Sequence, residues 1–365
     1  MKIVVTGGGT GGHIYPALSI ARQLRKQGAE LLFVGSQHGP EGRLAALDGL
    51  DFRAVPSGPI AGMSLRTARS LVKLGLGVVK SFQMLGEFRP DVVIGTGGYT
   101  SAGVLVAGCM RGIPIVIHEQ NSIPGKTNRA LARIANRVCV TFDESLAYFP
   151  KGKSVVTGLP VRESIVEGME AREARRSLQL DPEKFTVLVT GGSQGARRIN
   201  DAVLEAVPAL VQAGLQVLHL VGSKNYGDVV SRKPDVDGYV AAPYMDDMAA
   251  AYSAADLVVS RSGASTIAEI TVRGLPSVLI PYPFAYAGHQ LKNAEAVAKV
   301  GAGVVIEESE LTASSLVQTI LILVADPSRL AEMASWSRSL GRPNAAQEIA
   351  EIVQEVASRK LIADG

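Results

Sequence analysis

The sequence is poor in the residues that several classes of protein need. Aromatic residues make up 5% of its 365 residues, too few for the base-stacking platforms that bind single-stranded nucleic acid. No apolar run approaches the roughly 20 residues of a membrane-spanning helix. The two cysteines, Cys109 and Cys139, fit no zinc-ligand spacing and indicate a reducing compartment. We therefore expect no nucleic-acid partner and no transmembrane segment.

Clusters that hold a metal or another cofactor are also missing. Asp235 and Asp237 form an Asp-x-Asp pair, but they lie between Pro234 and Gly238, which is typical of a surface turn. No other grouping of Asp, Glu, His or Cys suggests a metal, so we expect neither a metal nor a cofactor. Because an apolar strand pattern already begins at Lys2, we also expect no signal peptide and a cytoplasmic protein.

Charge is divided unevenly along the chain. Residues 1–160 contain 18 Lys and Arg against 9 Asp and Glu, a net charge of +9. The remainder contains 19 basic and 25 acidic residues, a net charge of −6. This asymmetry predicts an anionic partner for the first half, and an anionic membrane surface is favoured because no nucleic-acid-reading motif is present.

The strand pattern indicates an α/β protein of more than one domain. A chain of 365 residues exceeds what one hydrophobic core usually serves. In the first half, short apolar strands alternate with helical patterns, which is typical of an open parallel sheet covered on both faces. The predicted strands are residues 2–6, 30–34, 52–55, 91–95, 113–118, 137–141 and 153–157.

The second half repeats the pattern of the first. A predicted strand at 185–190 runs into the glycine-rich residues 191–196, as the first strand runs into the opening loop. Two later segments of the first half have counterparts of similar sequence and spacing in the second half. These pairs are 91–98 with 256–263 and 112–117 with 274–280.

We therefore predict two Rossmann-like α/β domains that face each other across a cleft, residues 1–160 and 161–343. A last helix, residues 344–360, begins at Asn344, with Gln347 as the reciprocal partner of a capping box. This helix either closes the second domain or packs back on the first.

The opening loop, residues 6–13, has five glycines in six positions. Such a loop lets backbone N–H groups approach an anion or a sugar, and we expect the following helix to begin near Pro16. Gly7, Gly9 and Gly12 match a dinucleotide-binding fingerprint, which has low specificity by itself. That fingerprint requires an acid after the second strand, where this chain has Gly-Ser-Gln. A nicotinamide cofactor is therefore not expected here.

A better nucleotide site is predicted in the second half. Small residues at 262–266 follow a buried strand and open a helix, so their amides can hold a diphosphate. Glu269 can accept hydrogen bonds from a ribose, or it can merely complement the dipole of that helix from about its first turn. Downstream, residues 288–293 present neutral amides, which suit sugar hydroxyls and an N-acetyl group, or else begin a solvated helix.

Two residues are candidates for proton transfer. His13 lies just before a predicted helix, whose positive N-terminal end favours the neutral imidazole that accepts a proton. The alternative is a histidine that caps its own loop. Glu119 ends a predicted strand. A carboxylate at such a position holds a loop in place through hydrogen bonds as often as it transfers a proton.

Residues 59–85 predict a membrane-surface segment. Arg66, Arg69, Lys73 and Lys80 lie within about a 60° sector of a helix, and the apolar residues lie mostly elsewhere. An apolar loop precedes this helix, so apolar side chains and a basic rim can contact headgroups together. The alternative is an ordinary helix with a solvated basic face. By itself the helix would favour the ordinary interpretation, but the net positive charge of the first half makes the membrane-surface interpretation about equally favoured.

Motifs in order over nearly the whole chain resemble the MurG family of glycosyltransferases. They are 8–13, 97–99, 118–121, 160–162, 191–196, 245–248, 261–264, Glu269, Gln290 and Asn293. The resemblance implies a glycosyltransferase B fold and a peripheral enzyme at the cytoplasmic face of the inner membrane. It implies transfer of N-acetylglucosamine from UDP-N-acetylglucosamine to the C4 hydroxyl of undecaprenyl-diphosphate-linked N-acetylmuramyl-pentapeptide.

The resemblance also implies roles for individual residues in an inverting, metal-independent reaction. The base is hypothesised to be His13, and the chain departs from the family pattern at His289, where a glutamine is usual. The implied donor contacts are Met245 with the uracil; Ser193 and the backbone of Ala264, Ser265, Thr266, Ile267 and Ala268 with the diphosphate; Glu269 with the ribose; Gln290 and Asn293 with the sugar; and Thr10, Gly11, Gly12, Asn121 and Arg162 from the first domain and the hinge.

Three rival functions stay open from the sequence. The chain can be a glycosyltransferase of the same fold for another lipid or a natural product, a UDP-sugar epimerase, or a silent binding subunit. A required acceptor distinguishes the transferase from the epimerase. The presence of His13, Glu119, Glu269 and Gln290 together argues against the silent subunit.

Overall fold

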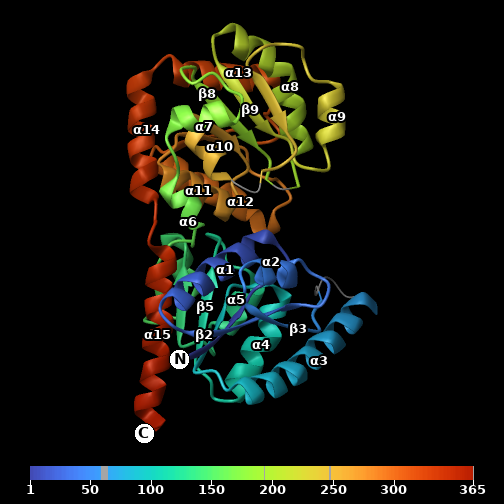
Figure 1. Ribbon diagram of the computed structural model, residues 1–365, viewed down its shortest axis with the longest axis vertical. Coiled ribbons are helices and arrows are strands. Elements are labelled where there is room, and N and C mark those ends of the chain that lie inside the picture. Colours follow the sequence, from blue (N-terminus) through green and yellow to red (C-terminus); the bar gives the residue numbers. More distant parts are fainter. Residues whose placement is uncertain (59–64, 193, 246–247, 365) are drawn as a thin grey trace. The chain divides into compact units, whose positions relative to one another are not determined.

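The structure is a computed structural model that describes residues 1–58, 65–192, 194–245 and 248–364 (Figure 1). The chain divides into two compact units, one of Met1–Val161 with Pro343–Gly365 and one of Arg162–Arg342. Each unit contains one parallel sheet with helices on both faces, so the predicted pair of parallel-sheet α/β domains is confirmed.

The sheet of the first unit has seven parallel strands in the order β3-β2-β1-β4-β5-β6-β7. All seven predicted strands are present, because each is a short apolar run buried on both faces or at an edge. The strands are β1 (Lys2–Thr6), β2 (Glu30–Ser36), β3 (Asp51–Val55), β4 (Val92–Gly95), β5 (Ile115–Glu119), β6 (Arg137–Val140) and β7 (Ser154–Val156).

Alternate side chains of these strands are buried in two hydrophobic cores, one on each face of the sheet. Ile3 and Val5 point into the core beneath α1 and α15, whereas Val4 and Leu32 point into the core beneath α3 and α4. The helices of this unit are α1 (Gly11–Lys26), α2 (Glu41–Leu47), α3 (Leu65–Phe88), α4 (Gly98–Met110), α5 (Lys126–Leu131), the 3-10 helix η1 (Asp143–Tyr148) and α15 (Ala345–Asp364).

Helix α1 begins at Gly11, so the predicted start near Pro16 is wrong. Thr10 is the N-cap in extended conformation, and its carbonyl accepts the N–H groups of His13 and Ile14 at 3.0 and 3.1 Å. The first turn therefore closes before the proline is reached. Pro16 lies inside the helix, where its missing N–H removes one backbone hydrogen bond.

The last helix, α15, packs on the first unit. Ile349 and Val353 are fully buried in the core that contains Ile3 and Val5, and Figure 1 shows α15 beside α1. The predicted capping box at its start is not formed. The side chain of Gln347 donates to Glu351 instead, one turn further along the helix.

The second unit has six parallel strands in the order β10-β9-β8-β11-β12-β13. Counted within each unit, both sheets begin 3-2-1-4-5-6, so the predicted internal duplication is confirmed. The elements are α6 (Glu163–Glu167), α7 (Ala171–Ser177), β8 (Thr186–Thr190), α8 (Arg197–Gln212), β9 (Gln216–Leu220), α9 (Tyr226–Ser231), β10 (Tyr239–Ala242), α10 (Met248–Ala254), β11 (Leu257–Ser260), α11 (Ala264–Arg273), β12 (Ser277–Leu279), η2 (Tyr286–Gly288), α12 (His289–Lys299), β13 (Gly303–Val305), α13 (Ala313–Val324) and α14 (Pro327–Leu340).

The order of the strands reverses between β1 and β4 in the first sheet and between β8 and β11 in the second. Ligands of such sheets bind beyond the carboxyl ends of the strands at this switch point, where the loops on the two sides diverge. Each unit therefore has one position at which a site is expected.

Candidate active site

Two glycine-rich turns meet at the switch point of the first sheet, one after β1 and one after β4. A side-chain carbon at Gly7 would collide with Thr96, and one at Gly98 would collide with the carbonyl of Gly8. The hydroxyl of Thr96 then donates to the carbonyl of His13 at 2.8 Å. These glycines therefore allow the two turns to touch, and this contact fixes the backbone of His13.

The ring of His13 is held in one tautomer. Its Nδ1 lies 3.0 Å from the carbonyl oxygen of Thr96 and 3.0 Å from Oε1 of Gln120. Both oxygens can only accept, so Nδ1 carries the proton and Nε2 carries the lone pair. Burial lowers the pKa of His13 below its ordinary 6.5, although its two hydrogen bonds oppose the shift. A neutral imidazole with a free Nε2 results, since no described residue bonds that nitrogen.

The orientation of Gln120 follows from the same argument. Its Nε2 donates to the carbonyl of Thr96 at 2.7 Å and lies 3.1 Å from Nδ1 of His118. The other nitrogen of His118 lies 2.9 Å from the carbonyl of Gly158 and must donate to it, so Nδ1 of His118 accepts from Gln120. Burial lowers the pKa of His118 to about 4, which keeps this ring neutral.

Glu119 is buried below the same loop, and both of its carboxylate oxygens are engaged. Oε1 accepts the backbone N–H of Asn121 at 3.0 Å. Oε2 accepts the side-chain amide of Asn128 at 2.8 Å and the N–H of Gly125 at 3.2 Å. Burial raises the pKa of Glu119 against these bonds. This geometry is that of an organiser of the loop, the second of the two roles weighed for Glu119 from the sequence.

Glu41 is a buried residue of the candidate site that the sequence did not single out. It is fully buried at the start of α2, and its carboxylate accepts the N–H of Gly9 at 2.8 Å and the hydroxyl of Ser36 at 3.0 Å. It therefore anchors the opening loop to the loop after β2. The only available signal was an acid five residues beyond the end of that strand.

The remaining predicted residues of the first unit lie around His13. Thr10 and Gly11 are exposed, and Gly12 is partly buried in the first turn of α1. Asn121 is partly buried and follows Gln120, whose side chain bonds His13. The structure thus brings these residues and His13 to one edge of the sheet.

In the second unit, α11 begins at Ala264, within the small residues 262–266 that were predicted to open a helix, and Gly263 is its N-cap. Ala264, Ile267 and Ala268 are buried, and Ser265 and Thr266 are partly exposed. The first turn of α11 therefore offers its N–H groups at the switch point of the second sheet.

Glu269 lies in the second turn of α11, so the predicted position near the first turn is wrong. Its Oε2 accepts the hydroxyl of Tyr252 at 2.9 Å, and its Oε1 lies 3.6 Å from the guanidinium of Arg162. Burial raises the pKa of Glu269, and the charge of Arg162 opposes this shift. Because the helix dipole acts mainly within the first turn, this arrangement disfavours a role for Glu269 in complementing the dipole.

Two side chains of α12 that were predicted to contact the sugar join this helix to two neighbouring loops. Asn293 is fully buried and donates to the carbonyl of Ser262 at 3.2 Å. Oε1 of Gln290 accepts the N–H of Tyr282 at 3.0 Å, which leaves its amide nitrogen without a partner among the described residues. His289, the departure from the family pattern, donates from Nδ1 to the carbonyl of Tyr286 at 2.9 Å.

Two predicted donor contacts cannot be placed fully. Ser193 lies outside the described residues, and Met245 is partly buried immediately before 246–247, which also lie outside them. Within the described part of the chain, no three His, Cys, Asp or Glu residues are grouped so that they could hold a metal ion. The Asp-x-Asp pair lies in the loop before β10, with a turn at Asp237 and Gly238.

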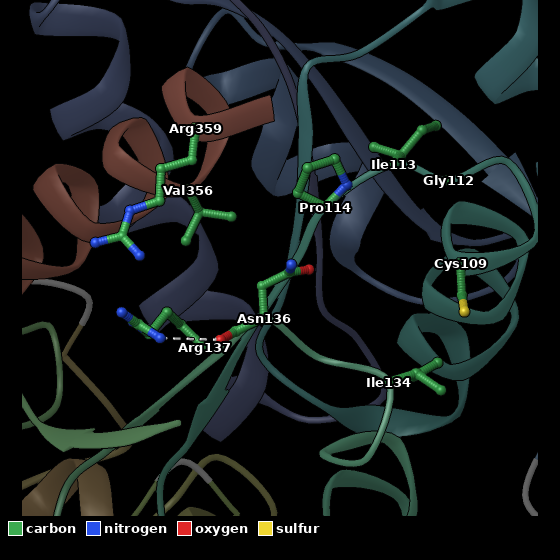
Figure 2. Close-up of a pocket in the computed structure, with 9 residues that line it drawn as sticks. All are labelled: Cys109, Gly112, Ile113, Pro114, Ile134, Asn136, Arg137, Val356 and Arg359. Atoms are coloured by element: carbon green, nitrogen blue, oxygen red, sulfur yellow. Dashed lines mark hydrogen bonds between the residues drawn. The ribbon is translucent and has the colours of Figure 1, made fainter. Parts of the chain in front are cut away.

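A separate cavity of about 470 Å³ lies at the amino ends of β5 and β6 (Figure 2). Asn136, Arg137 and Arg359 contribute its polar groups, and Arg359 pairs with Glu355 on its own helix. Because His13 and Gln120 lie at the carboxyl ends of the strands, this cavity is at the opposite edge of the sheet. It is therefore separate from the candidate active site.

Comparison with known proteins assigns both halves of the chain to one family. Residues 3–140 match the N-terminal domain of glycosyltransferase family 28, and residues 186–353 match its C-terminal domain. A relative from Desulforudis audaxviator (strain MP104C) is 41% identical over 371 residues, covering 98% of this chain and 99% of the relative. That relative is named UDP-N-acetylglucosamine--N-acetylmuramyl-(pentapeptide) pyrophosphoryl-undecaprenol N-acetylglucosamine transferase.

Solved structures show the same architecture. The crystal structure of Acinetobacter baumannii MurG has a TM-score of 0.79 and 29% identity, with 97% of this chain and 99% of that chain covered. A UDP-GlcNAc 2-epimerase from Neisseria meningitidis, bound to UDP-GlcNAc, has a TM-score of 0.71 at 15% identity, with 97% and 100% covered, and shares the fold alone. The chain has the glycosyltransferase B fold and belongs to the MurG family within glycosyltransferase family 28.

Proposed function

We propose that this chain transfers N-acetylglucosamine from UDP-N-acetylglucosamine to the C4 hydroxyl of undecaprenyl-diphosphate-linked N-acetylmuramyl-pentapeptide in peptidoglycan synthesis. The donor and acceptor classes are those in the names of relatives about 41% identical over nearly the full chain. The single observation that supports the chemistry is His13, a neutral imidazole whose Nδ1 proton is held and whose Nε2 is free. The alternative is a transferase of the same fold for another lipid or natural-product acceptor.

The reaction is one displacement with inversion. The acceptor oxygen forms a bond to the anomeric carbon as the bond from that carbon to the β-phosphate oxygen breaks, and the electron pair leaves with UDP. Nε2 of His13 takes the proton of the attacking hydroxyl, which is ordinary general-base catalysis. The N–H groups at the start of α11 stabilise the charge that develops on the departing diphosphate.

The donor residues keep the roles that the family resemblance implies. Glu269 accepts from the ribose hydroxyls while Tyr252 and Arg162 orient its carboxylate. The free amide nitrogen of Gln290 donates to the sugar. The full proposed donor set is Thr10, Gly11, Gly12, Asn121, Arg162, Ser193, Met245, Ala264, Ser265, Thr266, Ile267, Ala268, Glu269, Gln290 and Asn293. Glu119 acts as a positioning residue, because both of its oxygens already accept hydrogen bonds.

Peripheral attachment to the cytoplasmic face of the inner membrane is part of the proposal. Val72, Leu76 and Val79 of α3 are 63%, 56% and 58% exposed and recur at one-face spacing, with exposed Lys73 and Lys80 beside them. An ordinary crossover helix would bury such a stripe, and an interfacial helix inserts it among headgroups. The predicted apolar loop 59–64 lies outside the described residues, and no described helix has the length and apolarity to cross a bilayer.

The proposed reaction predicts transfer that depends on the acceptor and is insensitive to metal removal. Purified protein with UDP-N-acetylglucosamine and a short-chain lipid-linked muramyl-pentapeptide should release UDP and form the disaccharide product, with EDTA present throughout. Product analysis by mass spectrometry checks this result. Free sugar or an epimer formed without acceptor would favour the epimerase instead, and turnover of only unrelated acceptors would favour the alternative transferase.

The base assignment predicts the effect of His13→Ala and the shape of the pH profile. The variant should lose about 10²- to 10⁴-fold in kcat with little change in donor KM. Because burial lowers the pKa of His13, Nε2 stays unprotonated down to below pH 6.5. The midpoint of the acid limb of kcat/KM for the unmodified protein should therefore lie below pH 6.5. Near-normal turnover by His13→Ala would remove His13 as the base.

The hydrogen bond between Gln120 and His13 predicts that Gln120→Glu shifts the pH profile of kcat/KM. A carboxylate beside Nδ1 stabilises the imidazolium, so the pKa of His13 rises and the acid limb of kcat/KM shifts up by about one unit or more. Gln23→Glu, on α1 and away from this network, adds the same charge and should leave the profile unchanged. An unmoved acid limb in a folded Gln120→Glu variant would contradict the assigned role of Gln120.

The membrane proposal predicts salt-sensitive binding to anionic vesicles. Replacing Val72, Leu76 and Val79 by Ser should weaken flotation with phosphatidylglycerol vesicles, because the apolar contact is lost, and replacing Arg66 and Arg69 by Glu should weaken it through charge. Leu47→Ser, which changes an equally exposed apolar residue on α2, serves as the control. Vesicle binding that changes neither with salt concentration nor with the α3 substitutions would overturn the membrane proposal.

A further inference from the structure

A chain of three buried polar side chains crosses the second unit and has no role in the assignments above. Asn200 belongs to the first turn of α8, His219 to β9 and Tyr239 to β10. All three are almost fully buried. Nδ1 of His219 lies 2.9 Å from the hydroxyl of Tyr239, and Nε2 lies 3.1 Å from Oδ1 of Asn200. One imidazole thus joins three elements of the second unit.

The direction of each hydrogen bond in this network is fixed from its Asn200 end. The amide nitrogen of Asn200 donates to the carbonyl of Val221 at 3.0 Å, so Oδ1 is the atom that faces His219. An amide oxygen can only accept, so Nε2 of His219 carries the proton and Nδ1 accepts from the hydroxyl of Tyr239. Burial lowers the pKa of His219 to about 3, so the ring stays neutral. The network therefore has one arrangement of protons, and it ends on the carbonyl of Val221.

The carbonyl of Val221 lies against the glycine-rich turn that follows β8. A side-chain carbon at Gly195 would collide with this carbonyl oxygen, and one at Gly222 would collide with the backbone of Gly195. Both glycines have positive φ values, of 74° and 84°. The amide of Asn225 donates to the carbonyls of Gln194 and Val221, at 3.3 and 3.4 Å. The turns after β8 and β9 are thus in backbone contact, and the buried network ends at this contact.

The same network reaches the turn after β8 a second time, through α8. Ala196 ends the turn as the N-cap of α8, and its carbonyl accepts the N–H of Asn200 at 2.9 Å. Asn200 therefore bonds the end of one turn through its backbone and the start of the other through its side chain. A shift of α8 would break the buried bond to His219 and leave polar groups unpartnered, which is costly inside a protein. His219 thus restrains the position of the turn.

This turn lies at the switch point of the second sheet. It follows β8, and β8 pairs with β11, whose following loop leads into α11. Ligands of such sheets bind between these loops, where glycine turns and helix N-termini offer N–H groups to phosphate oxygens. In the proposed function, the donor's diphosphate occupies this place, whereas the proposed contacts of the uridine are Met245 and Glu269. A displaced turn would therefore weaken the hold on the diphosphate more than the hold on the uridine.

From these contacts we propose that His219 is a positioning residue for the donor's diphosphate, acting through Asn200 and the carbonyl of Val221 on the turn after β8. The assignment rests on the proposed function and deepens it, because it names the side chain that keeps one wall of the donor site in register with the sheet. A directional network permits one arrangement of α8 against β9, whereas apolar packing alone tolerates small shifts.

Calorimetry with UDP and with uridine tests the positioning role without any transfer reaction. His219→Leu removes the donor to Asn200 at similar side-chain volume, and it should weaken UDP binding about tenfold while leaving uridine binding unchanged. His219→Gln puts an amide nitrogen in place of Nε2 and should recover most of the UDP affinity. Tyr239→Phe breaks the network at the end away from the turn and should leave both affinities unchanged.

Val207→Ala on α8 separates positioning from a general loss of stability. Val207 is fully buried in the hydrophobic core of the second unit and is not one of the three polar residues. The smaller side chain leaves a cavity and lowers the unfolding temperature. The affinities of Val207→Ala for UDP and uridine should nevertheless equal those of the unmodified protein. In transfer assays, His219→Leu should raise the donor KM about tenfold and leave the acceptor KM unchanged.

Several results would overturn the positioning role. They are undiminished UDP affinity in His219→Leu, equal losses of UDP and uridine affinity in that variant, and an equally large loss of UDP affinity in Val207→Ala. An unmodified protein that binds UDP no more tightly than uridine would also overturn it, because its turn would then hold no diphosphate.

Two further arms keep the test decisive. If His219→Leu does not fold, Asn200→Ala breaks the same link while the bond between Tyr239 and His219 stays, and the same selective loss of UDP affinity is expected. Unchanged UDP affinity in Asn200→Ala would contradict the proposal. A protein that shows the selective loss but transfers no N-acetylglucosamine would keep the positioning role and overturn the proposed function.

Discussion

The close approach of two glycine turns at the end of the first sheet is the constraint on which the candidate site depends. Gly7 and Gly98 have no room for a side chain, and Gly97 and Gly98 also have positive φ values of 99° and 86°. With the turns in contact, Thr96 reaches His13 with its hydroxyl and with its carbonyl. The glycines that first suggested a phosphate loop thus contribute to the site by positioning a side chain. Gly9 is exposed and has open space around it, so this glycine can still face a ligand.

His13, Gln120 and His118 form a hydrogen-bonded network beside this contact. Two backbone carbonyls determine which atoms of the network carry the protons. A carbonyl cannot donate, so Gly158 fixes the tautomer of His118, and Thr96 fixes the amide of Gln120 and the tautomer of His13. The protons cannot be rearranged without leaving one of these buried groups unpaired, which costs about 1–3 kcal/mol. The lone pair of His13 is therefore kept on the nitrogen that has no protein partner.

The second sheet repeats the topology with different chemistry at its switch point. Where the first unit has an imidazole and neutral amides, the second has a helix N-terminus and Glu269, whose carboxylate is held by Arg162 and Tyr252. A duplicated scaffold thus carries two unlike sets of loops, and in the proposed function one set holds the nucleotide while the other deprotonates the acceptor hydroxyl. Strand order sets where a site lies, and the loop residues set what it does.

The difference between topology and loops also explains what could be predicted from the sequence. Strands and the internal duplication were readable because apolar runs and repeated segments are local features. The start of α1 and the turn containing Glu269 were misjudged by about one turn, since proline and small residues constrain a helix start only loosely.

The contacts that define the candidate site join residues that are far apart in the sequence. Gln120 is 107 residues from His13, and Glu41 is 32 residues from Gly9. No periodicity links such pairs, and neither Gln120 nor Glu41 differs in type from many solvated residues of the chain. Only the strand order brings them together, because the ends of β2, β1, β4 and β5 are neighbours at one edge of the sheet. In a parallel sheet, the sequence therefore predicts which loops lie next to each other. The side-chain hydrogen bonds between those loops depend on three-dimensional packing, which cannot be inferred from the sequence pattern.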